Sequence, residues 1–192
     1  HLLAGRTAQV LNLHSLGNDL GVDGKTLKQW LSVLEASFIV FRLPPYFENF
    51  GKRIIKTSKL YFTDTGLLCY LLGIEKPEQV MRNPAFGQLF ENLVVAEALK
   101  TRYNQGKRPN LYFFRDNNRN EVDLVFDHAR QLMPVEIKAA MTWNPDFLRG
   151  ILHFQKSIPT AVKGAVIYSG ELQPDLEAAT VLNFKRTGKL FQ

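Results

Sequence analysis

Two short runs near the middle of the chain limit its fold most, because apolar and charged residues alternate in both. The first run covers residues 121–126 and the second covers 134–138, with the polar stretch 127–131 between them. Alternation over a few residues is typical of a strand that has one buried face. The two runs therefore predict a β-hairpin.

The alternation also predicts which side chains share a face, since successive side chains in a strand point to opposite sides. One face is expected to carry the apolar members of both strands: Val122, Leu124, Phe126, Val135 and Ile137. The other face then carries Asp123, Glu136 and Lys138. Two carboxylates and one ammonium group are thus expected together on the sheet.

Such a cluster suits Mg²⁺ or Mn²⁺, because hard divalent cations bind carboxylate oxygens and keep waters for a substrate phosphate. The metal can supply hydroxide and stabilise developing charge, and Lys138 can orient the attacking water or share that charge. The pattern also fits a solvated sheet face on which Glu136 and Lys138 form a surface ion pair worth little. The two strands alone leave both alternatives open.

An upstream segment adds a third carboxylate to this picture. Apolar residues recur at helical spacing through 86–103, which predicts a helix with Glu91 in its first two turns. A glutamate near a helix start can simply complement the helix dipole. The order along the chain, however, is Glu91 on the helix, a predicted strand at 111–115, and then the hairpin.

This order resembles the PD-(D/E)xK nuclease superfamily, whose core is a helix, three strands, a helix and a further strand. The resemblance implies that Glu91, Asp123 and Glu136 are metal ligands of a catalytic centre and that Lys138 is its catalytic lysine. Val122 stands where the superfamily name has proline. Many members keep only the aspartate of that pair.

The first part of the chain predicts short helices over 2–13, 15–20 and 24–37, with a tight turn at Gly21 and an N-cap at Asp23. The third helix has an expected apolar stripe of Leu27, Trp30, Leu31 and Leu34. Two helices joined by a short glycine-containing turn form a helix-turn-helix, whose second helix can enter the major groove of DNA. The side chains expected to face outward there are Lys25, Thr26, Lys28 and Gln29.

Predicted strands at 38–43 and 60–62 flank a basic segment that has no acid between Glu48 and Asp64. Its cations are Lys52, Arg53, Lys56 and Lys59. This pattern predicts a winged helix with a basic wing that contacts DNA phosphates. A basic hairpin can equally be a solvated loop, and winged helices also serve as protein-docking modules.

The remaining segments complete an α/β order. Prolines within 75–84 mark a predicted boundary between a winged-helix domain at 1–84 and a nuclease-like domain at 85–192. A helix is expected at 145–157 and a strand at 161–168. An edge hairpin is expected from 180–184 and 189–191.

Composition narrows the class of protein further. The formal net charge of +6 favours a polyanionic partner such as DNA. The single cysteine, Cys69, excludes an intramolecular disulfide and favours the reducing cytoplasm. No apolar run approaches the roughly 18 residues of a membrane span, so no membrane contact is expected. The chain begins without Met, which suggests a C-terminal fragment of a longer protein.

Four runs, together with the strand motifs, resemble one particular family: 26–37, 43–46, 59–66 and 87–92. It is the domain of unknown function that follows the ATPase module in many bacterial and archaeal AAA+ family ATP-binding proteins. The resemblance implies that an ATPase module precedes residue 1 in the intact protein.

Two hypotheses of function follow from these patterns. The first is a nuclease that depends on Mg²⁺ or Mn²⁺, is directed to DNA by the winged helix and hydrolyses phosphodiester bonds. The alternative is a non-catalytic DNA-binding or regulatory module that docks onto the ATPase.

Overall fold

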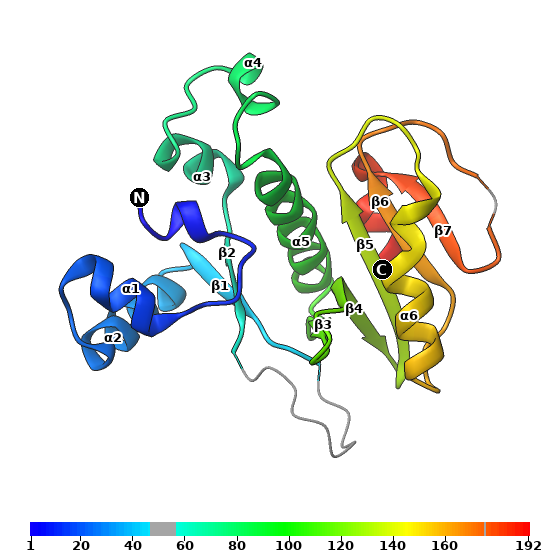
Figure 1. The fold of residues 1–192 in the computed structure, drawn as a ribbon, viewed down its shortest axis with the longest axis horizontal. Helices are drawn as coiled ribbons and strands as arrows, with labels where there is room; N and C mark the ends of the chain where they lie inside the picture. The colour runs from blue at the N-terminus through cyan, green and yellow to red at the C-terminus, as the bar shows by residue number, and fades with distance from the viewer. Residues whose placement is uncertain (47–56, 175) are drawn as a thin grey trace.

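The computed structural model describes residues 1–46, 57–174 and 176–192, in two groups of elements that meet at one long helix (Figure 1). The N-terminal group contains η1 (Ala4–Arg6), α1 (Leu13–Leu20), α2 (Gly24–Ala36), β1 (Val40–Leu43), β2 (Lys59–Phe62), α3 (Thr65–Leu71) and α4 (Pro77–Val80). The second group contains α5 (Phe86–Asn104), β3 (Leu111–Arg115), β4 (Glu121–His128), β5 (Gln131–Lys138), η2 (Pro145–Leu148), α6 (Arg149–Ser157), β6 (Gly164–Tyr168), β7 (Ala179–Asn183) and η3 (Phe184–Leu190).

Five strands form one mixed sheet in the order β3-β4-β5-β6-β7. The first three are antiparallel neighbours, whereas β5, β6 and β7 run parallel. The predicted hairpin of β4 and β5 is confirmed, and its strands are longer than the sequence indicated. Ala129 and Arg130 connect them with φ values of 53° and 68°, a left-handed two-residue turn that normally favours Asn and Gly. The Asp127 side chain accepts a hydrogen bond from the Arg130 N–H and stabilises this turn.

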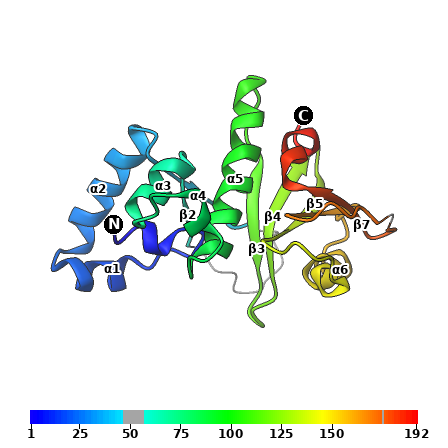
Figure 2. The ribbon, with the colours of Figure 1, turned by 90° about the horizontal axis from the view of Figure 1, so that it is seen from above.

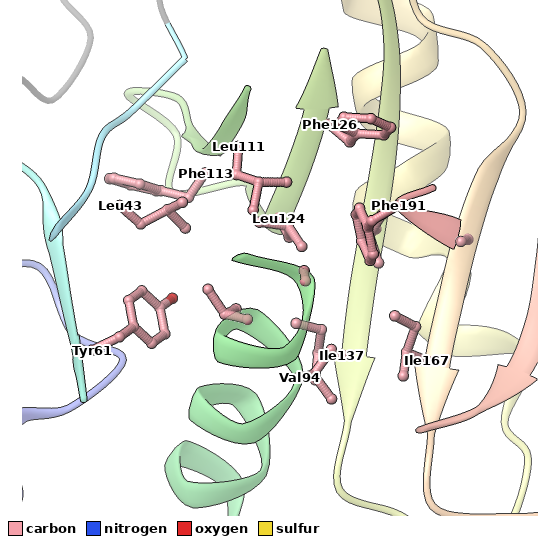
Figure 3. Close-up of a cluster of buried hydrophobic side chains, with 14 of the residues drawn as sticks. Leu43, Tyr61, Val94, Leu111, Phe113, Leu124, Phe126, Ile137, Ile167 and Phe191 are labelled. Atoms are coloured by element: carbon pink, nitrogen blue, oxygen red, sulfur yellow. The ribbon is translucent and has the colours of Figure 1, made fainter. Parts of the chain in front are cut away.

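Helices cover both faces of the sheet (Figure 2). On one face, Val94 of α5 and Phe191 after η3 share a core with Leu124 and Ile137 (Figure 3). On the other face, α6 packs its apolar side over β4, β5 and β6. The mixed α/β class is therefore confirmed. The edge hairpin predicted near the C-terminus is wrong, because β7 pairs in parallel with β6 and the next residues form η3.

The N-terminal group confirms the short helices on either side of a tight turn. Gly21 has a φ of +65°, and the Asp23 side chain caps α2 by accepting hydrogen bonds from two backbone N–H groups. The helix predicted over 2–13 is wrong: a single 3₁₀ turn is followed by a segment in which the Ala8 N–H bonds to the Leu60 carbonyl of β2. Trp30 does not join the apolar stripe of α2, since it is 49% exposed while Leu27 is buried.

Helix α5 belongs to both groups because a buried asparagine ties it to β2. Asn92 is fully buried, and its side-chain oxygen accepts hydrogen bonds from the Phe62 N–H at 2.7 Å and the Thr7 hydroxyl at 2.9 Å. Its amide also donates to the Phe62 carbonyl at 3.0 Å. These contacts hold β2 across the first half of α5. The domain boundary at residues 84 and 85 stays a prediction.

None of the helices in the described ranges combines the length and apolar character needed to cross a membrane.

Replacing Asn92 should be costly, because Asn92→Ala leaves both backbone groups of Phe62 buried without their partners. Each buried unsatisfied group costs about 1–3 kcal/mol, so we expect a loss of roughly 3 kcal/mol and a fall in Tm of about 6–12 °C. The control is Asn104→Ala at the exposed end of the same helix. Equal melting curves for the two variants would contradict the role given to Asn92.

Candidate active site

The structure brings the four predicted catalytic residues to one region between α5 and the hairpin. A pocket of about 660 Å³ is lined there by side chains from β2, α5, β4 and β5. Its charged lining residues are Lys59, Glu91, Glu121, Asp123 and Lys138. Glu136 does not line the pocket but contacts Lys138. The first half of α5 and the adjoining ends of β4 and β5 therefore meet where the sequence predicted a cluster.

A β-bulge in β4 directs Asp123 into the pocket. Val122 and Val125 oppose Phe114 and Tyr112, so three steps on β4 match two on β3. Bulges of this kind re-aim side chains, often beside functional sites. One consequence corrects the predicted face pattern: Val122 packs with Val125 on the α6 side, not with Leu124 on the α5 side.

Asp123 and Glu136 are held on either side of the Lys138 ammonium. The Asp123 Oδ2 atom accepts hydrogen bonds from the Ile137 N–H at 2.9 Å and from Lys138 Nζ at 3.3 Å. Lys138 Nζ also donates to Glu136 Oε2. Glu136 is buried, whereas the Lys138 side chain is 32% exposed. Lys138 is thus the most exposed member of this trio, and Asp123, at 15%, is partly exposed as well.

Glu91 is fixed from the opposite side by two residues of β2. Its Oε1 atom accepts hydrogen bonds from Lys59 Nζ at 2.9 Å and from the Tyr61 hydroxyl at 2.7 Å. Lys59 Nζ lies 2.6 Å from Glu121 Oε1 as well, and its side chain is only 3% exposed. Arg115 Nε lies 3.6 Å from the other Glu121 oxygen. The N-terminal group therefore supplies part of the site.

Burial and the neighbouring charges shift the pKa values of the site's carboxyl groups in opposite directions. Burial, reinforced by Asp123, raises the pKa of Glu136 to about 8 and that of Glu91 to about 7. Burial also acts to raise the pKa of Asp123, but the nearby Lys138 and Lys59 ammonium groups outweigh it and lower that pKa. The pKa values of Glu91 and Glu136 are thus raised well above the ordinary value of a glutamate, while that of Asp123 is lowered.

The carboxylate oxygens of the site are of the kind that binds a divalent cation, but each carboxylate forms an ion pair with a lysine. Within residues 1–46, 57–174 and 176–192, no group of three or more His, Cys, Asp or Glu side chains is arranged to hold a metal ion. The Lys138 ammonium stands between Asp123 and Glu136, so a cation at that position has to displace it. Carboxylate oxygens are the ligands that Mg²⁺ and Mn²⁺ prefer.

Glu136 fits below α6 only because residue 150 is glycine. A Cβ atom at Gly150 would lie 1.9 Å from Glu136 Oε1 and 2.6 Å from the Glu121 carbonyl oxygen. Contacts under 3 Å force a neighbour to move. The second residue of α6 therefore sets how closely the helix approaches this carboxyl group.

The predicted DNA-contacting residues fall in three different situations. Lys25, Lys28 and Gln29 are exposed on α2, as expected of a DNA-contacting face, while the Thr26 hydroxyl donates to the cap residue Asp23. Lys59 is not on an exposed wing but inside the candidate site. The remaining wing cations, Lys52, Arg53 and Lys56, lie outside the described residues.

Comparison with known proteins identifies the family of the second group of elements. A model of the domain of unknown function DUF4143 matches residues 86–186, more than half of the chain. The chain belongs to the DUF4143 family. A model of a second domain of unknown function, DUF8612, matches residues 1–78.

Two relatives are similar to this chain over most of its length. They are uncharacterized proteins of Mycobacterium tuberculosis and Mycobacterium bovis, each 31% identical over 171 residues. The match covers 88% of this chain and 37% of either relative. The chain thus spans little more than a third of the length of these relatives.

Several residues of the candidate site were missed from the sequence. Glu121 could have been noticed, because it stands two residues before Asp123 on the same predicted strand. Tyr61 and Arg115 carry no local signal, since only the packing of β2 and β3 against α5 brings them here. Gly150 carries no local signal either, because its role depends on how closely α6 packs against Glu136 of β5.

Glycine substitutions test the packing of this site directly. Gly150→Ala should destabilise the chain and displace Glu136, because overpacking of this kind costs typically about 1–3 kcal/mol. The matched control is Gly87→Ala on α5, where an added Cβ meets nothing within 4 Å. That control should gain roughly 0.5–1 kcal/mol, the usual difference between Ala and Gly inside a helix. Thermal unfolding of both variants checks the pair, and equal shifts would contradict the proposed packing.

Proposed function

We propose that this chain is a nuclease of the PD-(D/E)xK type that hydrolyses phosphodiester bonds in DNA with the help of Mg²⁺ or Mn²⁺. The observation that carries the proposal is the convergence of Glu91 from α5 with Asp123, Glu136 and Lys138 from the hairpin. These residues come from separate elements: Glu91, Asp123 and Lys138 line one pocket, and Glu136 contacts Lys138. A solvated sheet face does not require Glu136 to be buried.

The order of elements supports the same proposal. Helix α5 is followed by the strands β3, β4 and β5, then by α6 and by β6. This is the helix, three strands, helix and strand order of the nuclease core.

In the N-terminal group, α1 and α2 precede the antiparallel pair β1 and β2, the order of a winged helix. The exposed residues of α2, Lys25, Lys28 and Gln29, are then the proposed DNA contacts.

Glu91, Asp123 and Glu136 are the residues that would hold the cation. When bound there, the metal supplies a nucleophilic hydroxide and neutralises charge on the phosphate. The protein's own contribution begins with Ile137, whose N–H fixes the Asp123 carboxylate. Tyr61 and Lys59 fix Glu91 in the same way. These hydrogen bonds hold the carboxylates in place before any substrate arrives.

Lys138 is the residue best placed to act on the scissile phosphate. It is exposed enough to be reached, and it has two carboxylates as alternative partners. Once released from them, its ammonium can donate hydrogen bonds to a phosphate oxygen or to the attacking water. Because that contact strengthens as charge develops, it accelerates the chemical step more than it favours binding.

A non-catalytic role is the second candidate, and one observation favours it. Each carboxylate of the site already has a lysine partner, so the cluster can persist as a structural ion-pair network that needs no metal. In that case the chain would be a DNA-binding or regulatory module that docks onto an AAA+ ATPase module of the intact protein. The relatives are long enough to contain such a module, since the match covers 37% of their length.

Cleavage assays test the catalytic proposal. Purified wild-type chain should cut DNA with Mg²⁺ or Mn²⁺ and lose this activity in EDTA. Lys138→Ala should lower the cleavage rate by about 100-fold or more, the typical loss when one charge-stabilising donor is removed, while its DNA affinity stays within a factor of two or so. The control is Lys163→Ala, an exposed lysine immediately before β6, which should behave as wild type.

Full activity in the Lys138→Ala variant would contradict the role of this lysine. Cleavage that is absent with every metal and every DNA substrate, in the chain and in the full-length protein, would favour the non-catalytic module.

A further inference from the structure

A second pocket lies between β1, the C-terminal end of α5 and the start of β3 (Figure 1). Its volume is about 380 Å³. Tyr103 of α5 lines it, and this residue lies twelve positions after Glu91, which is about 18 Å along the helix axis. The pocket is therefore separate from the candidate active site.

Three aromatic rings line this pocket, those of Phe41, Tyr103 and Tyr112. Tyr103 is 56% exposed, although it is a large ring at the end of a helix. The Phe41 ring stacks on Tyr61 of β2, with 5.5 Å between the ring centroids and an angle of 19° between the planes. The pocket thus offers flat apolar rings to a ligand at the protein surface.

Both charged residues of the lining are arginines, and in the described part of the chain no acidic residue lines the pocket. Arg42 donates two hydrogen bonds to the Glu35 carboxylate, at 2.6 and 2.7 Å, so its charge is offset. Arg108 is exposed, and its guanidinium has no ion-pair partner among residues 1–46, 57–174 and 176–192. Arg108 is therefore the cation that an anionic ligand can reach.

The loop that carries Arg108 is fixed by the surrounding structure. The Arg108 carbonyl accepts a hydrogen bond at 3.3 Å from Nε of Arg102, a residue that is only 5% exposed. Two residues later, the Asn110 carbonyl accepts one from the Asp127 N–H of β4 at 2.9 Å. Such a preformed pocket loses less conformational freedom when a ligand binds.

Rings beside an unpaired guanidinium match the chemistry of a single nucleotide. Bases stack on aromatic side chains, and arginine binds phosphate oxygens. In a duplex the faces of each base are covered by its neighbours, so only an unpaired base can enter such a pocket. The formal net charge of +6 also favours a polyanionic ligand.

We propose that this pocket binds an unpaired base of a DNA strand, with the base stacked on Tyr103 and a neighbouring phosphate on Arg108. The choice of DNA rests on the proposed function, whereas the chemistry of the pocket depends on no metal. The substrate class is thereby DNA that has an unpaired stretch, such as a single strand, a fork or a frayed end. Helix α5 then joins the strand-binding pocket to the candidate active site.

Binding measurements in EDTA test the role of Tyr103 without any cleavage. Fluorescence anisotropy should show that Tyr103→Ala lowers the affinity for a labelled single strand by about tenfold, the usual effect of losing one stacked base. Its affinity for the duplex of the same strand should stay as in the wild type. Tyr103→Phe keeps the ring and should bind the strand normally. The matched control is Tyr70→Ala, an exposed tyrosine of α3 that does not line the pocket.

The salt dependence of strand binding tests Arg108. Loss of one phosphate contact should reduce the slope of log K against log salt concentration by about 0.7 in Arg108→Gln. Lys163→Gln removes a charge outside the pocket and should leave the slope unchanged. Because Tyr103 and Arg108 are exposed, these variants should keep the Tm of the wild type.

The inference is overturned if the wild type does not bind the strand, or if Tyr103→Ala binds it as tightly as Tyr70→Ala does. Equal losses for strand and duplex would also contradict an unpaired base. Thymidine monophosphate that binds as tightly as the strand, or an RNA strand that binds more tightly, would overturn the choice of a DNA strand. Absence of cleavage with Mg²⁺ and Mn²⁺ contradicts the nuclease proposal alone, since strand binding is measured in EDTA.

Discussion

Four carboxylates lie in and beside one pocket, and the rest of the site depends on how their mutual repulsion is offset. Two lysines from opposite directions do this, Lys59 from β2 and Lys138 from the end of β5. Buried charges of this kind persist only where partners and hydrogen bonds are fixed in place. The bulge in β4, the glycine at position 150 and the buried Asn92 provide that fixation.

The same constraint explains why the two groups of elements are so closely joined. Helix α5 carries Glu91 toward the site, and the next residue, Asn92, binds β2. Because β2 in turn carries Lys59 and Tyr61, one turn of helix both connects the groups and assembles the site. A shift of β2 relative to α5 would therefore change the pocket as well as the packing.

Much of the second group could be predicted from the sequence, because its elements have strong local patterns. The span of β3, the long α5 and the pairing of β4 with β5 were all expected. The gathering of Glu91, Asp123, Glu136 and Lys138 followed from those elements. The bulge that moves Val122 to the other face was not predictable, since it depends on how β3 and β4 register.

The errors in the sequence prediction have similar physical causes. Lys59 was assigned to a solvent-exposed wing because its neighbours in sequence are basic, yet its strand alternation turns it inward to meet Glu91 and Glu121. The segment 2–13 was predicted to be a helix, but it forms a single 3₁₀ turn followed by an extended stretch against β2. In both cases a tertiary contact outweighs a local preference.

The central claim is that the carboxylates of α5, β4 and β5 form a divalent-cation site, and melting curves of the wild type and Asp123→Asn test it most directly. Because the Lys138 and Lys59 ammonium groups lower the pKa of Asp123, its ionised form stabilises the fold, so Asp123→Asn should lower the Tm of the metal-free protein. Millimolar Mg²⁺ or Mn²⁺ should raise the Tm of the wild type only, since a ligand at 100 times its Kd adds about 2.7 kcal/mol. A wild type whose Tm responds to neither ion would contradict the claim and leave a structural ion-pair network in its place.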